Sequence, residues 1–338
     1  MIKIRKPLSF IEIGRKDNQE DYLYPTHVDT NTHVFIMCDG MGGHDNGEVA
    51  SKTAATALGE YLSSCKEIDI PTFETGLKKA YEALDAIDTN SSKKPGTTMT
   101  CLCLNENSYL VAHIGDSRIY HIRPSLYNKD LKRGGILYQS SDHSLVNDLL
   151  KAGELTEEEA RDFPQKNIIT RAMQPHLSKR YKADVFVFDD IQEGDYFFLC
   201  CDGVLEQLSN ETLCEILATP KLSDERKLME IKKICDGKTR DNYTCWLIQI
   251  DKVSIKNNST NSQIIQAEAE EKDKRENLKS VDSSKDKHDK KKGDFGIIQV
   301  FNKTKDLKFK KFAYWVLIAF GIILSICIIF FVLYKALQ

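Results

Sequence analysis

Acidic residues that border apolar runs are the groups in this sequence whose types and spacing could do chemistry. Four of them lie where an apolar, strand-like run begins or ends: Asp39 after residues 34–38, Asp116 after 109–114, Asp202 after 196–201, and Asp241 before 243–250. An Asp-Gly pair after one strand is most often an ordinary turn, so a single junction indicates little. Recurrence at four distant places predicts that these carboxylates converge on one end of a sheet structure.

Clustered carboxylates without clustered His or Cys favour hard cations. Their oxygens suit Mg²⁺ or Mn²⁺ and disfavour zinc or copper. Two such ions held by shared carboxylates can lower the pKa of a bridging water and stabilise its in-line attack on phosphorus. A Ser or Cys nucleophile has less support, because no GxSxG occurs and no cysteine has an evident activating His beside it. The loop GMGG at 40–43 lacks the Lys-Ser/Thr ending of a phosphate-binding loop, which argues against a nucleotide site.

The size and composition fit one large intracellular domain with added segments. The chain has 338 residues, a net charge of -3 and a pI near 6.3, which gives no reason to expect nucleic acid as a partner. Most of its ten cysteines sit inside apolar runs and none form a CxxC pair, so we interpret them as buried thiols in a reducing compartment. The first 14 residues lack an uninterrupted apolar stretch and do not form a signal peptide, which predicts a cytosolic first domain.

The elements that must position the carboxylates alternate between strand-like and helix-like runs. Strands are expected at 8–13, 34–38, 99–104, 109–113, 181–188, 196–201 and 244–250, and helices at 48–65, 73–87, 145–152, 155–163, 209–217 and 224–235. The turn at 105–108 is short enough to join 99–104 and 109–113 as an antiparallel hairpin. This order predicts an α/β layered domain whose sheet is at least partly antiparallel.

Two of these helices should lie against a sheet. In 48–65, the residues four positions apart that define a helical face are Val49, Thr53, Ala57 and Tyr61. In 73–87, the corresponding apolar residues are Leu77, Ala80, Tyr81 and Leu84.

Several charged stretches have a purely structural alternative to a catalytic role. Residues 14–21 could be a solvated charged loop. Asp116 and Arg118 could form a local ion pair at a turn. Residues 142–144 are better explained as an N-cap for 145–152 than as catalysts, and Thr156 with Glu159 predicts a capping box. Residues 167–173 are expected to form a loop with one anchored cation.

From residue 252 the composition changes to Lys, Asp, Glu, Ser and Asn. Such a segment cannot bury enough apolar surface to offset the entropy of ordering, so we interpret 252–311 as a charged flexible linker. If it behaves as a flexible coil, its root-mean-square reach is on the order of 45 Å. The apolar segment 296–301 inside it could begin a membrane contact or act as a docking peptide, and the sequence favours neither.

Residues 312–334 form an uncharged stretch rich in Ile, Leu and Phe. At about 1.5 Å per residue, this length crosses a bilayer core of roughly 30 Å as a transmembrane helix. Tyr314, Trp315 and Tyr334 lie where interfacial aromatic residues belong. Five lysines lie between 303 and 311 and one follows the stretch, so the positive-inside rule predicts a single-pass, C-terminally anchored protein whose first domain faces the cytosol.

Taken together, the motifs resemble one known family. In chain order they are NQED (18–21), CDGMGGH (38–44), GTT (96–98), IGDSR (114–118), SDHSLV (141–146), NIITRAM (167–173), CDG (201–203) and DN (241–242). This ordered set resembles the metal-dependent protein phosphatase 2C family, and the DGMGG and DHSLV forms are most similar to its bacterial branch. The resemblance covers residues 8–251 and assigns 1–251 to a catalytic domain.

The resemblance implies two central antiparallel β-sheets flanked by α-helices, with a centre for two Mn²⁺ or Mg²⁺ ions at one end. It implies that Asp39 bridges the ions, that the Gly40 carbonyl is a ligand, and that Asp202 and Asp241 complete the site. Asp116 would join Asp202 at a weaker third ion. Residues around 167–173, including Thr170 and Arg171, would belong to a flap beside the substrate.

Three departures from the family pattern bear on the site. The family's phosphate-binding Arg lies five residues before an acidic partner, and here that spacing allows Arg15 with Glu20 or Lys16 with Asp21. Met41 stands where some relatives have a His proposed as the acid for the leaving group. Gln174-Pro175 follows the flap motif, where Gly is usual.

The function implied is dephosphorylation of phosphoserine and phosphothreonine in proteins at the cytosolic face of a membrane, by attack of a metal-bridging water. Expected partners are phosphorylated proteins, substrates of a serine/threonine protein kinase, and the lipid bilayer. Two alternatives remain at this stage. One is a catalytically silent phosphatase-like module that binds partners at the membrane, against which the intact acidic set argues. The other is a metal-dependent hydrolase of small phosphoesters.

Overall fold

The computed structural model describes residues 2–42, 46–87, 94–161, 163 and 168–253. These residues form two six-stranded sheets in which every strand pair is antiparallel. The first sheet has the order β1 (Ile2–Ile4), β12 (Tyr243–Val253), β11 (Tyr196–Cys200), β8 (Arg118–Ile122) and β9 (Ile136–Gln139), with β2 (Leu8–Glu12) also paired to β12. The second has the order β10 (Asp184–Phe188), β7 (Tyr109–Ile114), β6 (Met99–Leu104), β4 (Val34–Met41) and β3 (Asp21–Tyr24), with β5 (Gly96–Thr97) paired to β4.

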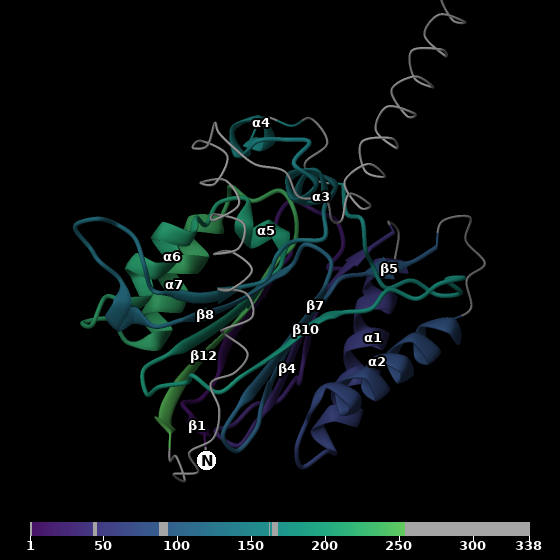
Figure 1. Cartoon of the computed structure of the whole chain (residues 1–338), viewed down its shortest axis with the longest axis horizontal. Coiled ribbons are helices and arrows are strands. Elements are labelled where there is room, and N and C mark those ends of the chain that lie inside the picture. Colours follow the sequence, from purple (N-terminus) through teal and green to yellow (C-terminus); the bar gives the residue numbers. More distant parts are fainter. Residues whose placement is uncertain (1, 43–45, 88–93, 162, 164–167, 254–338) are drawn as a thin grey trace, which may run out of the picture. The chain divides into compact units, whose positions relative to one another are not determined.

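Helices cover both outer faces of this pair of sheets (Figure 1). On one side lie α1 (Asn46–Ser63) and α2 (Ile70–Asp85), and on the other α6 (Asn210–Leu217) and α7 (Asp224–Cys235). The remaining helices are α3 (Leu145–Ala152), α4 (Glu157–Arg161), α5 (Asp202–Leu205) and a 3₁₀ turn at Pro124–Leu126. The expected sandwich of two antiparallel sheets flanked by helices is confirmed.

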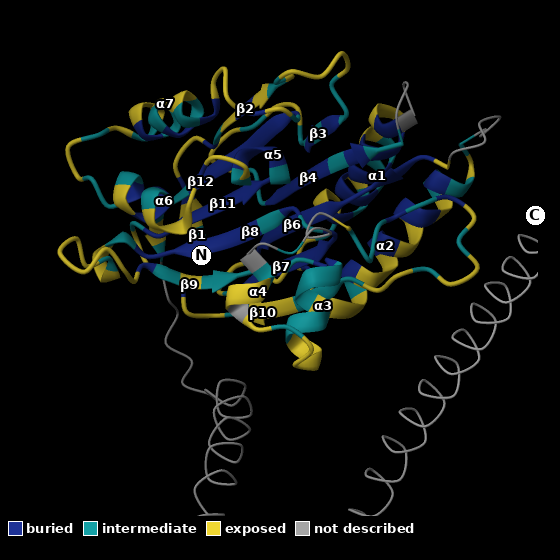
Figure 2. Ribbon diagram, turned by 90° about the horizontal axis from the view of Figure 1, so that it is seen from above, coloured by how far each residue is buried: buried dark blue, intermediate teal, exposed yellow. Residues whose placement is uncertain are grey.

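The uninterrupted apolar run of strand β4 follows from the burial of both its faces. Side chains alternate across a strand, so Val34, Ile36 and Cys38 pack against α1 and α2, whereas Phe35 and Met37 face the other sheet. Both faces are therefore buried (Figure 2). The Phe35 ring meets Trp246 of β12 edge to face at a centroid distance of 5.5 Å, which joins the two sheets at their centre.

Two local expectations were wrong. The Asp39-Gly40 pair does not end its strand, because β4 continues to Met41 by pairing Gly40 with Thr97 and Met41 with Gly96. In α1 the buried face is not the one through Val49, which is 44% exposed, but the neighbouring one through Ala54, Leu58 and Leu62. The two series differ by one residue, which is about 100° around the helix, so the predicted face borders the buried stripe and Thr53, Ala57 and Tyr61 are only partly buried.

Other local expectations are confirmed. Strands β6 and β7 pair as a hairpin, and Leu77 and Tyr81 of α2 are buried. Ser144 caps α3 by accepting a hydrogen bond from the Asn147 backbone amide. Thr156 and Glu159 form the reciprocal bonds of a capping box at α4.

The linker predicted at 252–311, its apolar segment 296–301 and the transmembrane helix predicted at 312–334 lie outside the described residues, apart from the first two linker positions. Among the helices that the structure does describe, none is both long and apolar enough to cross a membrane. The nine cysteines in this part of the chain are all free thiols, and all but Cys65 are buried.

Candidate metal centre

Asp21 and Asp39 lie opposite each other on neighbouring strands. They are register partners in the β3–β4 pair, and the alternation along β4 puts Asp39 on the same side as Phe35 and Met37, between the two sheets. The backbone amide of Asp39 donates to the Thr98 hydroxyl at 3.1 Å, and the Thr97 hydroxyl donates to the Asp39 carbonyl at 3.0 Å. Thr97 of β5 and the adjacent Thr98 therefore fix the backbone on both sides of Asp39.

The first sheet contributes Asp202 and Asp241 from adjacent strands. Asp202 begins α5 directly after β11, and Asp241 precedes β12, which pairs with β11. The approach is so close that a Cβ on Gly203 would lie 1.9 Å from the Asn242 carbonyl oxygen. A side chain at position 203 would therefore force these two segments apart.

Asn242 links the first sheet to the loop that carries Glu20. Its Oδ1 accepts from the Glu20 amide at 2.8 Å, while its Nδ2 donates to the carbonyls of Ile13 at 2.9 Å and Asn18 at 3.0 Å. The Glu20 carbonyl in turn accepts from the Gly40 amide at 3.1 Å. The backbone of residues 13–20 is thus fastened to both sheets, while the side chains of residues 15–18 remain exposed, as in the solvated loop that their charge allowed.

Asp116 enters the same site from the connection between β7 of the second sheet and β8 of the first. Arg118 does not pair with it. The Arg118 guanidinium instead binds Asp142 through two hydrogen bonds of 2.7 Å. The structural alternative of a local Asp116–Arg118 ion pair was therefore wrong, and Asp116 stays with the acidic cluster.

Burial and mutual repulsion raise the pKa values of these carboxyl groups. Burial first, and then Asp21, Asp202, Asp116 and Asp241, raise the pKa of Asp39 well above its ordinary value. Burial also raises the pKa of Asp21 and that of Asp116 to about 7, and with Asp241 nearby it raises the pKa of Asp202 to about 6. Because the charges of Asp21, Asp116, Asp202 and Asp241 all act on Asp39, the four sequence-predicted aspartates do converge, with Asp21 as a fifth member.

The donor set fits a hard divalent cation. Asp21 is 4% exposed, and its two carboxylate oxygens, like Oδ1 of Asp116, are buried without a hydrogen bond of good geometry from the residues described here. Oxygens of this kind are costly unless something binds them. Cys201 also lies within 4.8 Å of the Asp21 and Asp39 oxygens, but burial holds the pKa of its thiol well above the usual range. The neutral thiol leaves an oxygen site that suits Mg²⁺ or Mn²⁺.

The two candidate phosphate-binding cations lie in different places. The Lys16 ammonium is 2.9 Å from Asp241 Oδ1. Burial lowers the pKa of Lys16, but the hydrogen bond to Asp241 and the charges of Glu20 and Asp39 outweigh it, so the pKa is raised overall. Arg15 instead donates from Nη2 to the Gly237 carbonyl at 2.7 Å and is exposed. Of the two, the structure brings Lys16 to the carboxylates.

Glu20 and Gly40 pack against the first turn of α1. A Cβ on Gly40 would be 2.3 Å from the Gly47 carbonyl oxygen, and a Cβ on Gly47 would be 2.3 Å from Glu20 Oε1. The Glu20 carboxylate therefore rests against the first turn of α1. Close packing of backbone on backbone here leaves the Gly40 position no room for a side chain.

The predicted flap residues lie beside the Asp116 connection. The Thr170 amide donates to the His143 carbonyl at 2.8 Å, and Arg171 Nη1 donates to Asp184 Oδ1 at 3.2 Å. At the end of this segment, Met173 pairs with Thr97 through two backbone hydrogen bonds. Arg171 is thus the anchored cation that the sequence predicted. His143, which the sequence offered only as part of an N-cap, is 1% exposed and lies between this segment and Gly115.

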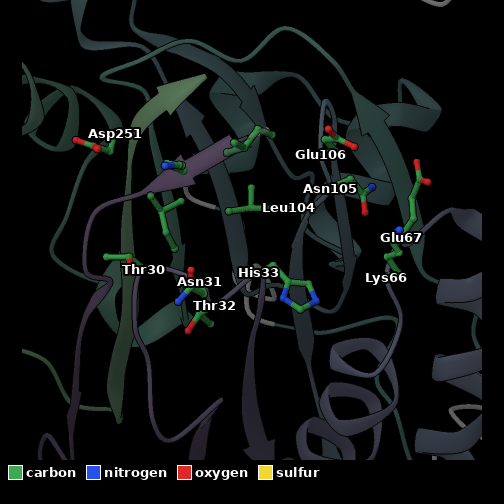
Figure 3. Close-up of a pocket in the computed structure, with 13 residues that line it drawn as sticks. Thr30, Asn31, Thr32, His33, Lys66, Glu67, Leu104, Asn105, Glu106 and Asp251 are labelled. Atoms are coloured by element: carbon green, nitrogen blue, oxygen red, sulfur yellow. The ribbon is translucent and has the colours of Figure 1, made fainter. Parts of the chain in front are cut away.

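A separate pocket of about 550 Å³ lies at the other end of the sheets (Figure 3). It is lined by His33 and Leu104, which adjoin the ends of β4 and β6 remote from Asp39, and by Asp251 near the end of β12. Cations and carboxylates are mixed around it and do not converge on a point in the close-up. We assign it no role in the chemistry of the acidic site.

Comparison with known proteins identifies the class. The sequence profile described as Protein phosphatase 2C matches residues 12–226, which is more than half of the chain. The chain is 31% identical over 259 residues to "Protein phosphatase PhpP" of Streptococcus pneumoniae, covering 71% of this chain and 95% of that protein. The chain therefore belongs to the protein phosphatase 2C family of metal-dependent serine/threonine phosphatases, as its motifs implied.

Solved structures share the fold. The S. agalactiae serine/threonine phosphatase aligns with a TM-score of 0.59 at 29% identity, covering 72% of this chain and 99% of that one. The catalytic domain of the serine threonine protein phosphatase PstP, described in complex with two manganese ions, aligns with a TM-score of 0.61 at 24% identity, covering 75% and 100%.

Proposed function

We propose that this chain hydrolyses phosphoserine and phosphothreonine in proteins with Mn²⁺ or Mg²⁺ as its cofactor. The observation that carries the proposal is the convergence of five aspartates at one end of the paired sheets. Asp21 is buried and the other four are partly buried. The pKa values are raised for Asp21, Asp39, Asp116 and Asp202. Such a cluster is unfavourable for the metal-free protein, and cation binding relieves it. The manganese ions described for PstP support the same choice of metal.

The residues of the site have separable roles in this proposal. Asp39 lies between the sheets and would contact both cations, Asp202 and Asp241 would hold one, and the Gly40 carbonyl with Glu20 and Asp21 would support the other. Asp116, beside Asp202, would hold a weaker third cation. When bound, two divalent cations activate a water and stabilise the charge that develops on a phosphoryl group.

Lys16 is our choice for the phosphate-binding side chain. Its ammonium already lies at the rim of the site, 2.9 Å from Asp241, and its side chain is exposed, so it can turn from that carboxylate toward a dianionic phosphate. Its positive charge would position the phosphoryl group over the carboxylates. Of the two pairings that the sequence allowed, we therefore prefer Lys16 with Asp21 to Arg15 with Glu20.

Phosphoproteins fit this site better than small phosphoesters because of the adjoining segment Ile168–Met173. Arg171 is 39% exposed at the side chain and belongs to the part of the chain that the family resemblance places beside the substrate. In this proposal a peptide extends from the phosphate along this segment and gains contacts that a small ester lacks. A serine/threonine kinase that supplies the phosphorylated substrates completes the proposal.

We place the enzyme at the cytosolic face of a membrane on sequence grounds alone. The uncharged stretch at 312–334 and the five lysines before it support a C-terminal anchor. The tether would raise the effective concentration of membrane-bound substrates without any new contact. Truncation after Asp251 should therefore leave kcat/KM for a soluble phosphopeptide similar to that of the full chain and slow the processing of a membrane-embedded substrate. Loss of turnover of the soluble peptide would contradict a passive tether.

The activity is tested by Mn²⁺-dependent phosphate release from a phosphothreonine peptide, compared with p-nitrophenyl phosphate and an unbranched alkyl phosphate. We expect the peptide to give the highest kcat/KM and Asp39→Asn to remove turnover of all three. Preference for the small esters would favour the small-phosphoester hydrolase, and no turnover of any substrate would favour a silent binding module.

A further inference from the structure

His143 contacts two parts of the site at once. Its backbone amide donates to the Gly115 carbonyl at 2.9 Å, and its ring Nδ1 accepts from the Gly115 amide at 3.1 Å. Both polar backbone groups of the residue before Asp116 are therefore held by one buried histidine. On its other side, the His143 carbonyl accepts from the Thr170 amide at 2.8 Å.

The chemistry of these contacts fixes the state of the ring. An amide can only donate, so Nδ1 must be unprotonated and the proton lies on Nε2. Nε2 is 3.2 Å from Asp184 Oδ2, to which it donates. Burial and the neighbouring His113 lower the pKa of His143 to about 4, which is consistent with a neutral ring. Each of the two ring nitrogens therefore has a defined hydrogen-bond partner.

A second metal site at this position is excluded by the same geometry, although His113, His143 and Asp184 have potential ligand atoms within 4.8 Å of one another. The two imidazole rings stack with centroids 4.6 Å apart and planes at 13°. An ion must lie in the plane of each ring that ligates it, and two nearly parallel stacked planes do not meet at such a point. Arg171 Nη1 also stands 3.3 Å from His143 Nε2, so a cation already occupies this space.

A small movement of the Gly115 backbone would displace residues of the acidic cluster. Its φ is +108°, and a Cβ there would lie 2.6 Å from Thr98 Cγ2. The Thr98 hydroxyl meets both the Asp39 amide at 3.1 Å and the Ser117 hydroxyl at 2.8 Å. The backbone around Asp116 is thus held from one side by Thr98 and from the other by His143.

We infer that His143 is a positioning residue, which holds the Gly115–Asp116 backbone in register with the segment Ile168–Met173 so that Asp116 can bind the third cation when substrate engages that segment. The inference rests on the proposed function and assigns a role to a side chain that touches neither the phosphate nor the metals. Its core is the hydrogen bond from the Gly115 amide to Nδ1. The link from Nε2 to Asp184 is secondary.

Two substitutions separate these bonds. His143→Asn places a carbonyl oxygen close to the position of Nδ1 and can still accept from the Gly115 amide, but it loses the reach to Asp184. His143→Gln places its amide close to the position of Nε2 and keeps the reach to Asp184, but leaves the Gly115 amide without its acceptor. Both replace a buried ring by a smaller amide, so the two proteins are matched for lost packing.

The readouts are phosphopeptide kinetics, calorimetric titration with Mn²⁺ alone, and thermal unfolding of each metal-free protein. For His143→Gln we expect kcat to fall about tenfold or more, as small misplacements near a reacting centre do, together with loss of the weakest Mn²⁺ binding step. For His143→Asn we expect most of the turnover and that binding step to be retained. The melting temperatures of the two variants should be similar.

Three results would overturn the inference: wild-type behaviour of both variants, losses that simply follow equal falls in melting temperature, or a defect confined to His143→Asn. A wild-type chain that binds Mn²⁺ but releases no phosphate from any substrate would instead refute the proposed function. The Mn²⁺ titration would still show whether His143 positions Asp116.

Discussion

Two clusters of charged side chains lie within the same pair of sheets and differ in how their charges are compensated. In one, Asp195 accepts from Arg123 Nε at 2.9 Å, from Arg123 Nη2 at 2.9 Å and from the Gln192 amide at 2.8 Å. The same carboxylate meets His121 Nε2 at 2.8 Å, and the Tyr109 hydroxyl meets His121 Nδ1 at 2.7 Å. In the other, Asp21, Asp39, Asp116 and Asp202 face one another.

The pKa values move in opposite directions as a result. Burial would raise the pKa of Asp195, but its hydrogen bonds with His121 and Arg123 outweigh burial and lower it. Burial raises the pKa of Asp116 to about 7, and the neighbouring Asp202 adds to the shift. Buried charge that is internally paired supports the fold, whereas buried charge of one sign requires a ligand from outside the chain.

The largest difference between the clusters should appear in activity. Asp39→Asn removes a ligand charge from the centre of the acidic cluster, so we expect phosphopeptide turnover to fall on the order of 10³-fold, the scale seen when a main electrostatic contribution is lost. The metal-free variant should be at least as stable as the wild type, because one repelling carboxylate is gone. Phosphate release and thermal unfolding measure the two effects, and full activity at saturating Mn²⁺ would refute the two-metal assignment.

Asp195→Asn should do the reverse. It leaves Arg123 and His121 buried without their shared anion, so we expect a loss of about 3 kcal/mol in the free energy of unfolding. Phosphate release well below the melting temperature should change little, since Asp195 precedes β11 and Asp202 follows it, so the two clusters lie at opposite ends of that strand. Asp190→Asn is the matched control. Asp190 binds the same Arg123 but its side chain is 59% exposed, so its removal should cost at most about 1 kcal/mol.

The pH dependence of stability should also differ between the acidic cluster and the Asp195 cluster. In the folded chain the pKa of Asp116 is raised to about 7. At any pH between the ordinary pKa of an Asp carboxyl and about 7, the folded chain therefore binds more protons than the unfolded chain. The stability of the metal-free protein should therefore fall as pH rises from 5.5 to 7.5. Asp116→Asn should reduce this slope and stabilise the protein at pH 7.5 by about 1 to 2 kcal/mol.

Thermal unfolding in EDTA across this range measures the slope. Saturating Mn²⁺ should weaken or reverse it, because the cation replaces the protons that the cluster takes up. A slope unaltered by Asp116→Asn would show that the cluster does not control this pH range. Asp195 should not contribute above pH 5, because its lowered pKa makes it stabilising throughout and its contribution is lost only in acid.

The smallest effect is expected at the rim. Lys16→Ala should raise KM for a phosphopeptide about tenfold with less change in kcat, if its contact is made equally in the ground state and the transition state. Arg15→Ala is the matched control on the adjacent residue and should leave both constants unchanged, since Arg15 binds the Gly237 carbonyl. Equal effects of the two substitutions, or none from either, would contradict the choice of Lys16.

The sequence predicted the members of the acidic cluster better than their surroundings. Asp39, Asp116, Asp202 and Asp241 could be found because each borders an apolar run, and strand ends in a layered sheet meet at its edge. The burial of Asp21 could not be read from the residues before it, which are polar or charged. The partner of Arg118 is Asp142, 24 residues away, and only the tertiary fold brings them together. The role of His143 likewise depends on Gly115 and Thr170, which are distant in the chain.

The order of the strands has a consequence for how this chain folds as it is made. All strands of the second sheet come from residues 21–188, together with α1 and α2, so this layer can form while synthesis continues. The first sheet pairs Ile2 with Val253 and Leu8 with Leu247. Contacts of such long sequence separation form slowly, and β1 and β2 must wait for the last strand to leave the ribosome. A nascent chain that stops short of β12 would expose the apolar inner face of the second sheet, which makes it a substrate for chaperones rather than a partial enzyme.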